Sequence, residues 1–218
     1  VASDLGFKFD KLKTPYLGPK YSNEDIKKDL DALKLEYEYM DENSLLDYVA
    51  DNILQGKIVG WLPGRLDFGE RALGNRSILA NPQDPIMKDK INKLIKFRES
   101  FRPFAPSVIL EEADKYFENI APTPYMTLTF DVKTDKLPAT THVDYTARVQ
   151  TVTKEDNLLY YKLLKTMGKK TGISAILNTR LNIMGQPIAC SPKDALAVFG
   201  ATGMDIMVLG NYVVTKNK

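Results

Sequence analysis

The stretch Lys57-Ile58-Val59-Gly60-Trp61-Leu62 leads almost directly into Gly64-Arg65-Leu66-Asp67-Phe68-Gly69-Glu70-Arg71-Ala72-Leu73-Gly74-Asn75-Arg76-Ser77. The first six residues are mainly apolar and predict a buried strand. The second stretch is too rich in glycine and turn-forming residues for a charged helix face, so we expect a loop. Gly69 and Gly74 flank Arg71, which lets the backbone approach a ligand without a Cβ in the way. This order predicts a sheet that carries an anion site.

On both sides of this stretch, helical and strand patterns alternate along the chain. Further strands are expected at 105–110, 125–132, 147–152, 173–177, 206–209 and 212–215. Helices are expected at 22–35, 45–53, 84–96, 111–117, 156–169 and 191–199. Interleaved elements of this kind predict an α/β (mixed α+β) fold, in which a twisted mixed β-sheet is flanked by helices.

Composition excludes several classes of protein. With 218 residues, 44% hydrophobic and 27% charged, the chain suits one large globular domain or one domain with an appendage. No apolar run approaches the roughly 18 residues of a membrane span, and no signal peptide is visible. A single cysteine, Cys190, and a single histidine, His142, exclude an internal disulfide and a cysteine or multi-histidine metal cluster, so we expect the cytoplasm. The chain begins with Val1, and we expect a fragment or a processed form.

Arginine is concentrated locally, although the net charge of the whole chain is only +2. Five arginines lie between Arg65 and Arg102, the last of them in Lys96-Phe97-Arg98-Glu99-Ser100-Phe101-Arg102-Pro103-Phe104. Lys96 and Arg98 would complement the dipole of the preceding helix, which leaves Arg102, beside a rigid proline, as the better ligand candidate. Guanidinium groups beside backbone amides bind phosphate well. Because G-x-x-x-x-G-K-[ST] and G-x-G-x-x-G are absent, a nucleotide site must be built from dispersed side chains.

Further candidate residues of the nucleotide site lie in separate parts of the chain. Arg71 and Arg76 are close enough to clamp one polyphosphate, unless the loop is only a solvated basic surface. The apolar residues among them, such as Phe68, favour partial burial. The strand at 147–152 would place Arg148 and Gln150 on one face. The remaining candidates are Asn178 and Asn182, which either contact a ligand or form turns, while His142 is expected to be structural and Cys190 to pack as a small apolar residue.

Several blocks of sequence, in a fixed order, resemble the C-terminal domain of O-carbamoyltransferases of the nodulation and antibiotic-tailoring type. These are GERALGNRSILANP (69–82), INKLIKFRESFRPFAPSV (91–108), THVDYTARVQTV (141–152), AILNTRLNIMGQPIACSPKDAL (175–196) and TGMDIMVLGNYVV (202–214). The resemblance starts near Tyr16 and runs to the end. It implies a YrdC-like domain at 22–218. Residues 1–21 would be the tail of an upstream actin-like ATPase-fold domain, absent from this chain, which holds the family's transition metal and acceptor site.

The resemblance also implies an activity. The domain would use carbamoyl phosphate and ATP, with Mg²⁺ accompanying ATP, to make carbamoyl adenylate and pyrophosphate, and the upstream domain would transfer the carbamoyl group to a hydroxyl. Positioned cations would stabilise the charge that develops on the phosphates. The implied residues are Lys96, Arg102 and Arg148 for catalysis, and Arg71, Arg76, Asn178 and Arg180 for nucleotide and phosphate. No metal ligand, membrane or nucleic-acid partner is expected in this chain, and a homodimer stays open.

Two positions depart from the family pattern. The family usually has N-T-S-F-N where this chain has Asn178-Thr179-Arg180-Leu181-Asn182. Arg180 thus replaces a small hydroxyl and would either bind phosphate or block the pocket. Tyr145 stands where the family tends to have glycine. Two other functions stay open: a synthase of threonylcarbamoyl adenylate for tRNA modification, and a non-catalytic RNA-binding or regulatory module, for which Arg180 would be an argument.

Overall fold

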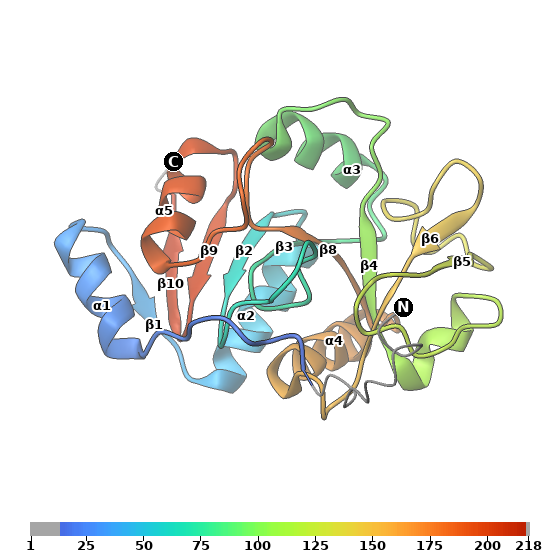
Figure 1. Cartoon of the computed structure of the whole chain (residues 1–218), viewed down its shortest axis with the longest axis horizontal. Helices are drawn as coiled ribbons and strands as arrows, with labels where there is room; N and C mark the ends of the chain where they lie inside the picture. The colour runs from blue at the N-terminus through green and yellow to red at the C-terminus, as the bar shows by residue number, and fades with distance from the viewer. Residues whose placement is uncertain (1–13, 217–218) are drawn as a thin grey trace, which may run out of the picture.

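The computed structural model describes residues 14–216, and the chain folds around one large mixed sheet (Figure 1). The helices are α1 (Asn23–Ala32), α2 (Glu42–Leu54), α3 (Ile86–Ile91), α4 (Leu158–Thr171) and α5 (Pro192–Ala201), with a π-helix at Asn92–Lys96 and a 3₁₀-helix at Leu110–Lys115. The strands are β1 (Glu38–Tyr39), β2 (Val59–Leu62), β3 (Ser77–Ala80), β4 (Ala105–Ile109), β5 (Thr129–Asp131), β6 (Thr146–Arg148), β7 (Gln150–Val152), β8 (Ala175–Arg180), β9 (Ile206–Leu209) and β10 (Tyr212–Thr215). Most of the tail predicted at 1–21, namely residues 1–13, lies outside the described residues.

The main sheet has eight strands in the order β1-β10-β9-β2-β3-β8-β4-β7. The pairs β2–β9 and β4–β7 are parallel, and the other neighbours are antiparallel. A separate two-stranded ribbon, β5–β6, stands at one end of the molecule (Figure 1). The predicted mixed sheet with flanking helices is therefore confirmed.

Side chains of the central strands point alternately to the two faces of the sheet, and each face packs into its own hydrophobic core. In β3, Ile78 and Ala80 pack on one face with α1, α3 and α5, whereas Leu79 packs on the other face with α2 and α4. This alternation follows from the two-residue period of a strand. Because both faces are covered, β2 and β9 carry apolar residues or glycine at every position, rather than at every second residue.

Local signals at helix ends account for several boundaries. Ser22 opens α1 and Ser191 opens α5, each with a reciprocal capping box to the aspartate three residues later, and Gly172 ends α4 in the left-handed region. The helix expected from residue 84 has Pro85 as the N-cap of α3, and Asp84 Oδ1 accepts from Ile86 N. Helix α2 starts at Glu42, three residues before the predicted 45, because Asp41 is its N-cap and accepts from the amides of Asn43 and Ser44.

Four predicted elements need correction. The strand expected at 125–132 shrinks to β5, because Met126 adopts a positive φ of 57° that no strand tolerates. The strand expected at 147–152 is divided between β6 and β7, which belong to different sheets. The short strand β3 lies in what was expected to be the end of the arginine loop, where its pairing with β2 and β8 decides its conformation. Strand β8 also runs on to Arg180, three residues beyond the predicted end.

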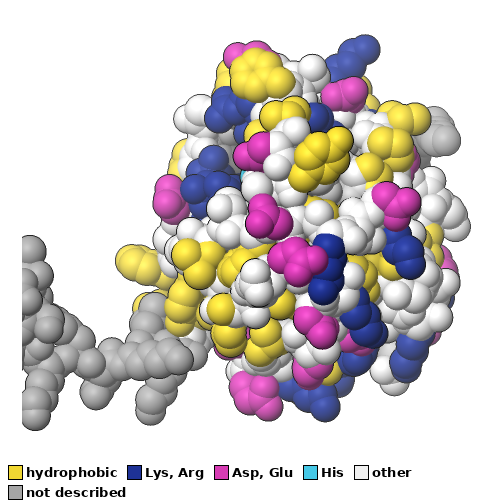
Figure 2. All heavy atoms as spheres, turned by 90° about the vertical axis from the view of Figure 1, so that its right-hand side faces the viewer, with side chains coloured by type: hydrophobic (Ala, Val, Ile, Leu, Met, Phe, Trp, Pro, Cys, Tyr) yellow, Lys and Arg dark blue, Asp and Glu magenta, His cyan; other side chains and the backbone are white. Residues whose placement is uncertain are grey.

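The face of the molecule beyond the β5–β6 ribbon carries charges of both signs (Figure 2). On the face beyond the β5–β6 ribbon, Lys and Arg side chains alternate with Asp, Glu and hydrophobic side chains (Figure 2). Within residues 14–216, no helix has the length and apolar character that a bilayer span requires. The arginines of the predicted site lie elsewhere, around a cavity.

Candidate active site

Five of the seven arginines in the chain line a single cavity of about 190 Å³. They are Arg71, Arg98, Arg102, Arg148 and Arg180. They come from the β2–β3 loop, the segment before β4, the end of β6 and the end of β8. Asn178, Thr179, Phe104 and Met126 complete much of the wall. Residues far apart in the sequence thus converge on one space, and six of the seven predicted site residues remain at or next to it.

The segment that carries Arg98 and Arg102 is held by one buried amide, that of Asn92. Asn92 Nδ2 donates to the carbonyls of Ser100 (3.3 Å) and Arg102 (3.0 Å), and Arg98 Nε donates to Asn92 Oδ1 at 2.7 Å. Asn92 starts the π-helix, which ends at Phe97 in the left-handed region (φ 48°). The wide turn also leaves Leu94 partly exposed, while Ile91 and Ile95 stay buried.

Lys96 lies behind the wall of the cavity and is buried. Its Nζ donates to the carbonyls of Arg180 (2.5 Å) and Asn182 (2.9 Å), and to Asn182 Oδ1 (2.8 Å). Burial, together with the charges of Arg98 and Arg180, holds the pKa of Lys96 well below its usual value. Lys96 and Asn182 line a second cavity of about 280 Å³, which shares Arg98, Arg102 and Arg180 with the first.

The arginines of the cavity are not balanced by nearby acids. Among the described residues, Glu70 lies 3.8 Å from Arg71 and Glu99 lies 3.9 Å from Arg102, and both carboxylates are largely exposed. Burial, with the charge of Arg102 next, lowers the pKa of Arg98 to about 10. Burial and then Arg71 lower the pKa of Arg148. Mutual repulsion of this kind is relieved when an anion binds, so the cavity favours anions.

Arg76 does not line the cavity and is fully buried. Its guanidinium donates to the carbonyls of Asn75 (2.8 Å), Pro63 (3.1 Å) and Cys190 (3.2 Å). The expected clamp of Arg71 and Arg76 on one polyphosphate is therefore corrected. Arg76 directly precedes β3, and its buried guanidinium joins the loop to these carbonyls from the inside. Of the two arginines, Arg71 alone lines the cavity.

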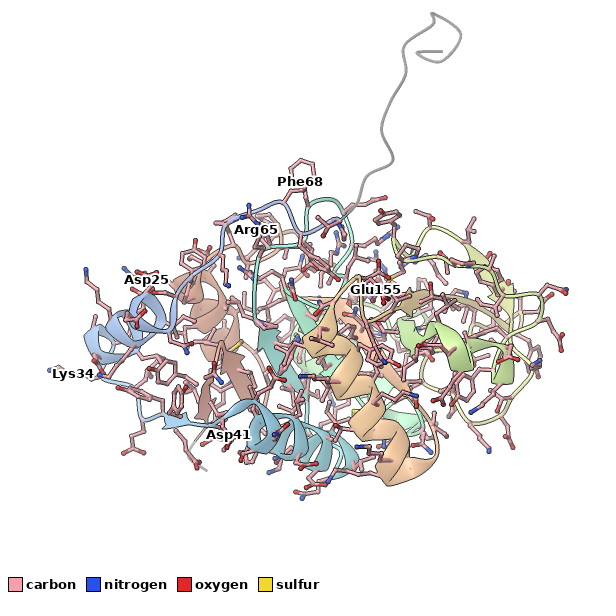
Figure 3. All side chains as sticks on the ribbon, turned by 90° about the horizontal axis from the view of Figure 1, so that it is seen from below. Asp25, Lys34, Asp41, Arg65, Phe68 and Glu155 are labelled. Atoms are coloured by element: carbon pink, nitrogen blue, oxygen red, sulfur yellow. The ribbon has the colours of Figure 1, made fainter. Side chains whose placement is uncertain are left out.

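The outer side of the same loop is exposed. Arg65 donates to the carbonyls of Tyr16 and Leu17, and Phe68 projects from the surface (Figure 3). Phe68 is 72% exposed, so the partial burial expected for it is wrong, although Leu73 of the same loop is buried. Phe68, Tyr125 and Met126 line a neighbouring cavity of about 500 Å³, which shares Arg71 and Arg148 with the first.

Asp67 organises the loop from within, a role that the sequence analysis missed. Its Oδ1 accepts from the backbone amides of Leu73 (3.0 Å) and Asn75 (3.3 Å), while Oδ2 has no partner among the described residues. Burial raises the pKa of Asp67 to about 6. Gly74 in the same loop packs tightly against Tyr160, and a Cβ at this position would come within 2.4 Å of the Tyr160 ring.

The raised pKa predicts a pH-dependent stability that Asp67→Asn removes. Between about pH 4 and pH 6 the folded chain holds a proton on Asp67 that the unfolded chain has lost, so the free energy of unfolding falls as pH rises through this range. A shift from 3.8 to about 6 corresponds to ~3 kcal/mol. Urea unfolding at a series of pH values should show this fall in the wild type and a flatter curve in Asp67→Asn, since Asn can still accept both amides. Parallel curves would contradict the assignment.

The remaining predictions concern residues outside the cavity. His142 Nδ1 lies 3.2 Å from Thr146 Oγ1, in a local contact of its own loop. Tyr145 is 75% exposed and adopts a φ of 61°, which explains why glycine would suit this position, and it does not line the cavity. Arg98, which the sequence analysis assigned to the helix dipole, lines the cavity and is a site residue that the sequence analysis missed. Its position directly after the predicted helix end, in the segment that also carries Arg102, was the signal available in the sequence.

Known proteins resemble this chain over most of its length. Residues 50–216 match the family model "Carbamoyltransferase C-terminus". Nodulation protein NolO of Bradyrhizobium diazoefficiens is 38% identical over 225 residues, which cover 99% of this chain and 41% of NolO. The 3'-hydroxymethylcephem-O-carbamoyltransferase of Amycolatopsis lactamdurans is 36% identical over 166 residues, which cover 76% of this chain and 32% of that enzyme.

Among solved structures, the P. abyssi Sua5 structure complexed with L-threonine superposes with a TM-score of 0.56 at 17% identity, covering 80% of this chain and 48% of that one. At this identity the likeness shows the fold alone, and it confirms the predicted YrdC-like fold. The chain spans about a third to two fifths of the length of the curated relatives it matches.

Proposed function

We propose, since this chain belongs to the carbamoyltransferase C-terminus family, that it forms carbamoyl adenylate from ATP and the carbamoyl group of carbamoyl phosphate. The observation that carries the proposal is the cavity lined by five arginines, with two exposed carboxylates beside them. Such an excess of cations, brought together from four segments, suits ligands that carry several negative charges.

The proposed reaction has two steps. Water cleaves the carbamoyl phosphate into carbamate and inorganic phosphate. An oxygen of the carbamate then bonds to the α-phosphorus of ATP, and the bond between this phosphorus and the bridging oxygen breaks to release pyrophosphate. Negative charge moves onto the departing pyrophosphate, so the main task of the protein is to position and stabilise charge. No nucleophilic side chain is required.

In this proposal each guanidinium group has a role that depends on which cavities it lines. Arg98, Arg102 and Arg180 stand between two cavities and hold phosphate groups, while Arg71 and Arg148 adjoin the cavity that contains Phe68. Mg²⁺ would be held by the phosphate oxygens of ATP. Lys96 acts as a positioning residue, because its three acceptors fix the end of β8 from which Arg180 projects.

The transfer step belongs to the longer protein. Relatives such as NolO are more than twice the length of the matched region. We propose that an upstream domain, which in this family would hold a transition metal, passes the carbamoyl group to a hydroxyl acceptor and selects that acceptor. The reaction would take place in the cytoplasm, where ATP is abundant.

A pyrophosphate-release assay tests the function. The chain, supplied with Mg-ATP and carbamoyl phosphate, should release pyrophosphate and form an adenylate detectable by mass spectrometry. Threonine with bicarbonate should not replace carbamoyl phosphate, because the proposed ligand is the carbamoyl group itself. Pyrophosphate release that depends on threonine would instead indicate a threonylcarbamoyl-adenylate synthase. Salt-dependent RNA affinity without pyrophosphate release would indicate a binding module.

A further inference from the structure

Residues 14–20 form a strap that precedes α1 and lies along the outer side of the β2–β3 loop, beside Arg65 and Phe68 (Figure 3). Three backbone hydrogen bonds join the strap to the loop, from Phe68 to Pro15 (2.7 Å), from Gly18 to Leu66 (3.1 Å) and from Leu66 to Pro19 (2.9 Å). The two segments approach closely, because a Cβ on Gly18 would lie 2.6 Å from Leu66 Cβ. The strap is therefore held to the loop through its backbone.

Two neighbouring residues of the strap hold the loop on both sides of Arg71. The Pro15 carbonyl accepts from Phe68 N, which lies before Arg71 in the sequence. Tyr16 Oη donates to the Leu73 carbonyl, which lies after Arg71, at 2.8 Å. The Tyr16 ring also packs in the small hydrophobic cluster that contains Leu73. The strap thus spans the turn from which Arg71 reaches the cavity.

Between these two anchors the loop has little support of its own. Within residues 14–216, the backbone groups of Gly69, Glu70 and Arg71 form no hydrogen bond. The Arg71 side chain is 31% exposed, and its ion pair with Glu70 is long, at 3.8 Å. The direction of the Arg71 guanidinium therefore depends on how the chain is fixed at Phe68 and Leu73.

The two anchors differ in what else supports them. At Leu73, the interior contributes as well, because Asp67 accepts from its amide and Gln150 donates to its carbonyl. At Phe68, the backbone hydrogen bond is the one that the strap supplies. The interior thus fixes one end of the turn, and the strap is needed to fix both.

We propose that Tyr16 is a positioning residue that acts through Arg71. With Tyr16 in place, the loop presents Arg71 to the cavity in one orientation, so a nucleotide meets a guanidinium that is already positioned. This inference rests on the proposed function, and it adds a residue that lines neither the arginine cavity nor the two beside it. Arg65 also donates to carbonyls of the strap, but those bonds are exposed, and water can replace them.

Calorimetric titration with Mg-ATP, without carbamoyl phosphate, measures the effect without turnover. Arg71→Met removes a charged donor and should weaken Mg-ATP binding about 10- to 100-fold. Tyr16→Ala should weaken it about 10-fold, because the cation is misplaced rather than removed. Tyr16→Phe keeps the ring and loses one hydrogen bond, so its affinity should fall about 3-fold.

A double-mutant cycle shows whether Tyr16 acts through Arg71. In the Arg71→Met background, Tyr16→Ala should change the affinity for Mg-ATP by less than about 2-fold, since no guanidinium is left to position. A residue that only supported the fold would lower the affinity equally in both backgrounds, or in neither. If Tyr16→Ala fails to fold, as circular dichroism would show, Tyr16→Phe takes its place in the cycle.

Tyr37→Phe is the matched control. The Tyr37 hydroxyl donates to Asp31 Oδ1 at 2.7 Å, and Tyr37 lines neither the arginine cavity nor the two beside it. The variant loses a hydrogen bond of similar length to that of Tyr16, and it should bind Mg-ATP as the wild type does.

Wild-type affinity in both Tyr16 variants, or equal losses with and without Arg71, would overturn the inference. The proposed function is tested separately. If the wild type binds Mg-ATP but releases no pyrophosphate with carbamoyl phosphate, the proposed reaction is wrong, and the cycle still decides the role of Tyr16. If the wild type does not bind Mg-ATP, the proposed function fails, and the inference fails with it.

Discussion

Arg148→Met is expected to reduce the release of pyrophosphate about 100- to 1,000-fold, as removal of one preorganised charged donor does in other active sites. Arg148 lines the cavity, and its Nε has no hydrogen-bond partner within residues 14–216. The fold itself should not suffer. Burial and the charge of Arg71 already lower the pKa of Arg148, so removing this cation relieves repulsion. We expect an unchanged or higher melting temperature, measured by calorimetry beside the steady-state rate.

Arg65→Met is the matched control, because the same side chain is replaced on the exposed outer side of the loop. Its rate should stay near that of the wild type. Loss of activity in Arg148→Met with a parallel loss of melting temperature would mean that Arg148 supports the fold rather than the ligand. A variant with the full wild-type rate would remove Arg148 from the site altogether.

Arg76→Met is expected to lower the free energy of unfolding by about 3–4 kcal/mol, since it leaves the carbonyls of Pro63, Asn75 and Cys190 without their donor in the interior. For a chain of this length that corresponds to a melting temperature lower by about 10 °C. Urea unfolding followed by circular dichroism measures the change.

Coupling with Asp67 sharpens this test. The positive charge of Arg76 lowers the pKa of the buried Asp67, so its removal leaves that carboxylate less compensated. In a double-mutant cycle, Arg76→Met should therefore cost less in the Asp67→Asn background than in the wild type. Additive effects would show that the two groups act independently. A stable Arg76→Met variant with weakened nucleotide binding would show that Arg76 contacts the ligand after all.

Much of the fold could be predicted because the chain carries strong local signals. Ser22 and Ser191 begin helices, Gly172 ends one, and the apolar strands at 57–62 and 206–209 need no knowledge of their neighbours. Prediction failed where tertiary contacts decide. Ser77–Ala80 becomes a strand by pairing with β2 and β8 on either side, and its four residues are too few to display a period.

Within the site, the types of residue could be predicted from the sequence, but the directions in which their side chains point could not. Arginines 71 and 76 belong to the same short loop and have the same chemistry, yet one lines the cavity and the other is buried beneath the loop. Arg98 was assigned to the helix dipole from its position after the predicted helix. In the fold, the amide oxygen of Asn92, six residues earlier, accepts from Arg98 Nε and turns Arg98 toward the cavity. Asn178 Oδ1 is buried without a hydrogen-bond partner among the described residues, and no pattern in the sequence predicts this.

The sequence by itself determined that this chain forms a mixed sheet flanked by helices, that arginine is concentrated near a loop, and that the family is that of the O-carbamoyltransferases. These properties depend on periodicity, on helix-end chemistry and on residue order, which are local. Only the tertiary structure decided which guanidinium groups face each other and which polar atoms lack partners. Those outcomes depend on the pairing of strands distant in sequence, because a register between β3, β8 and β4 sets where each side chain points.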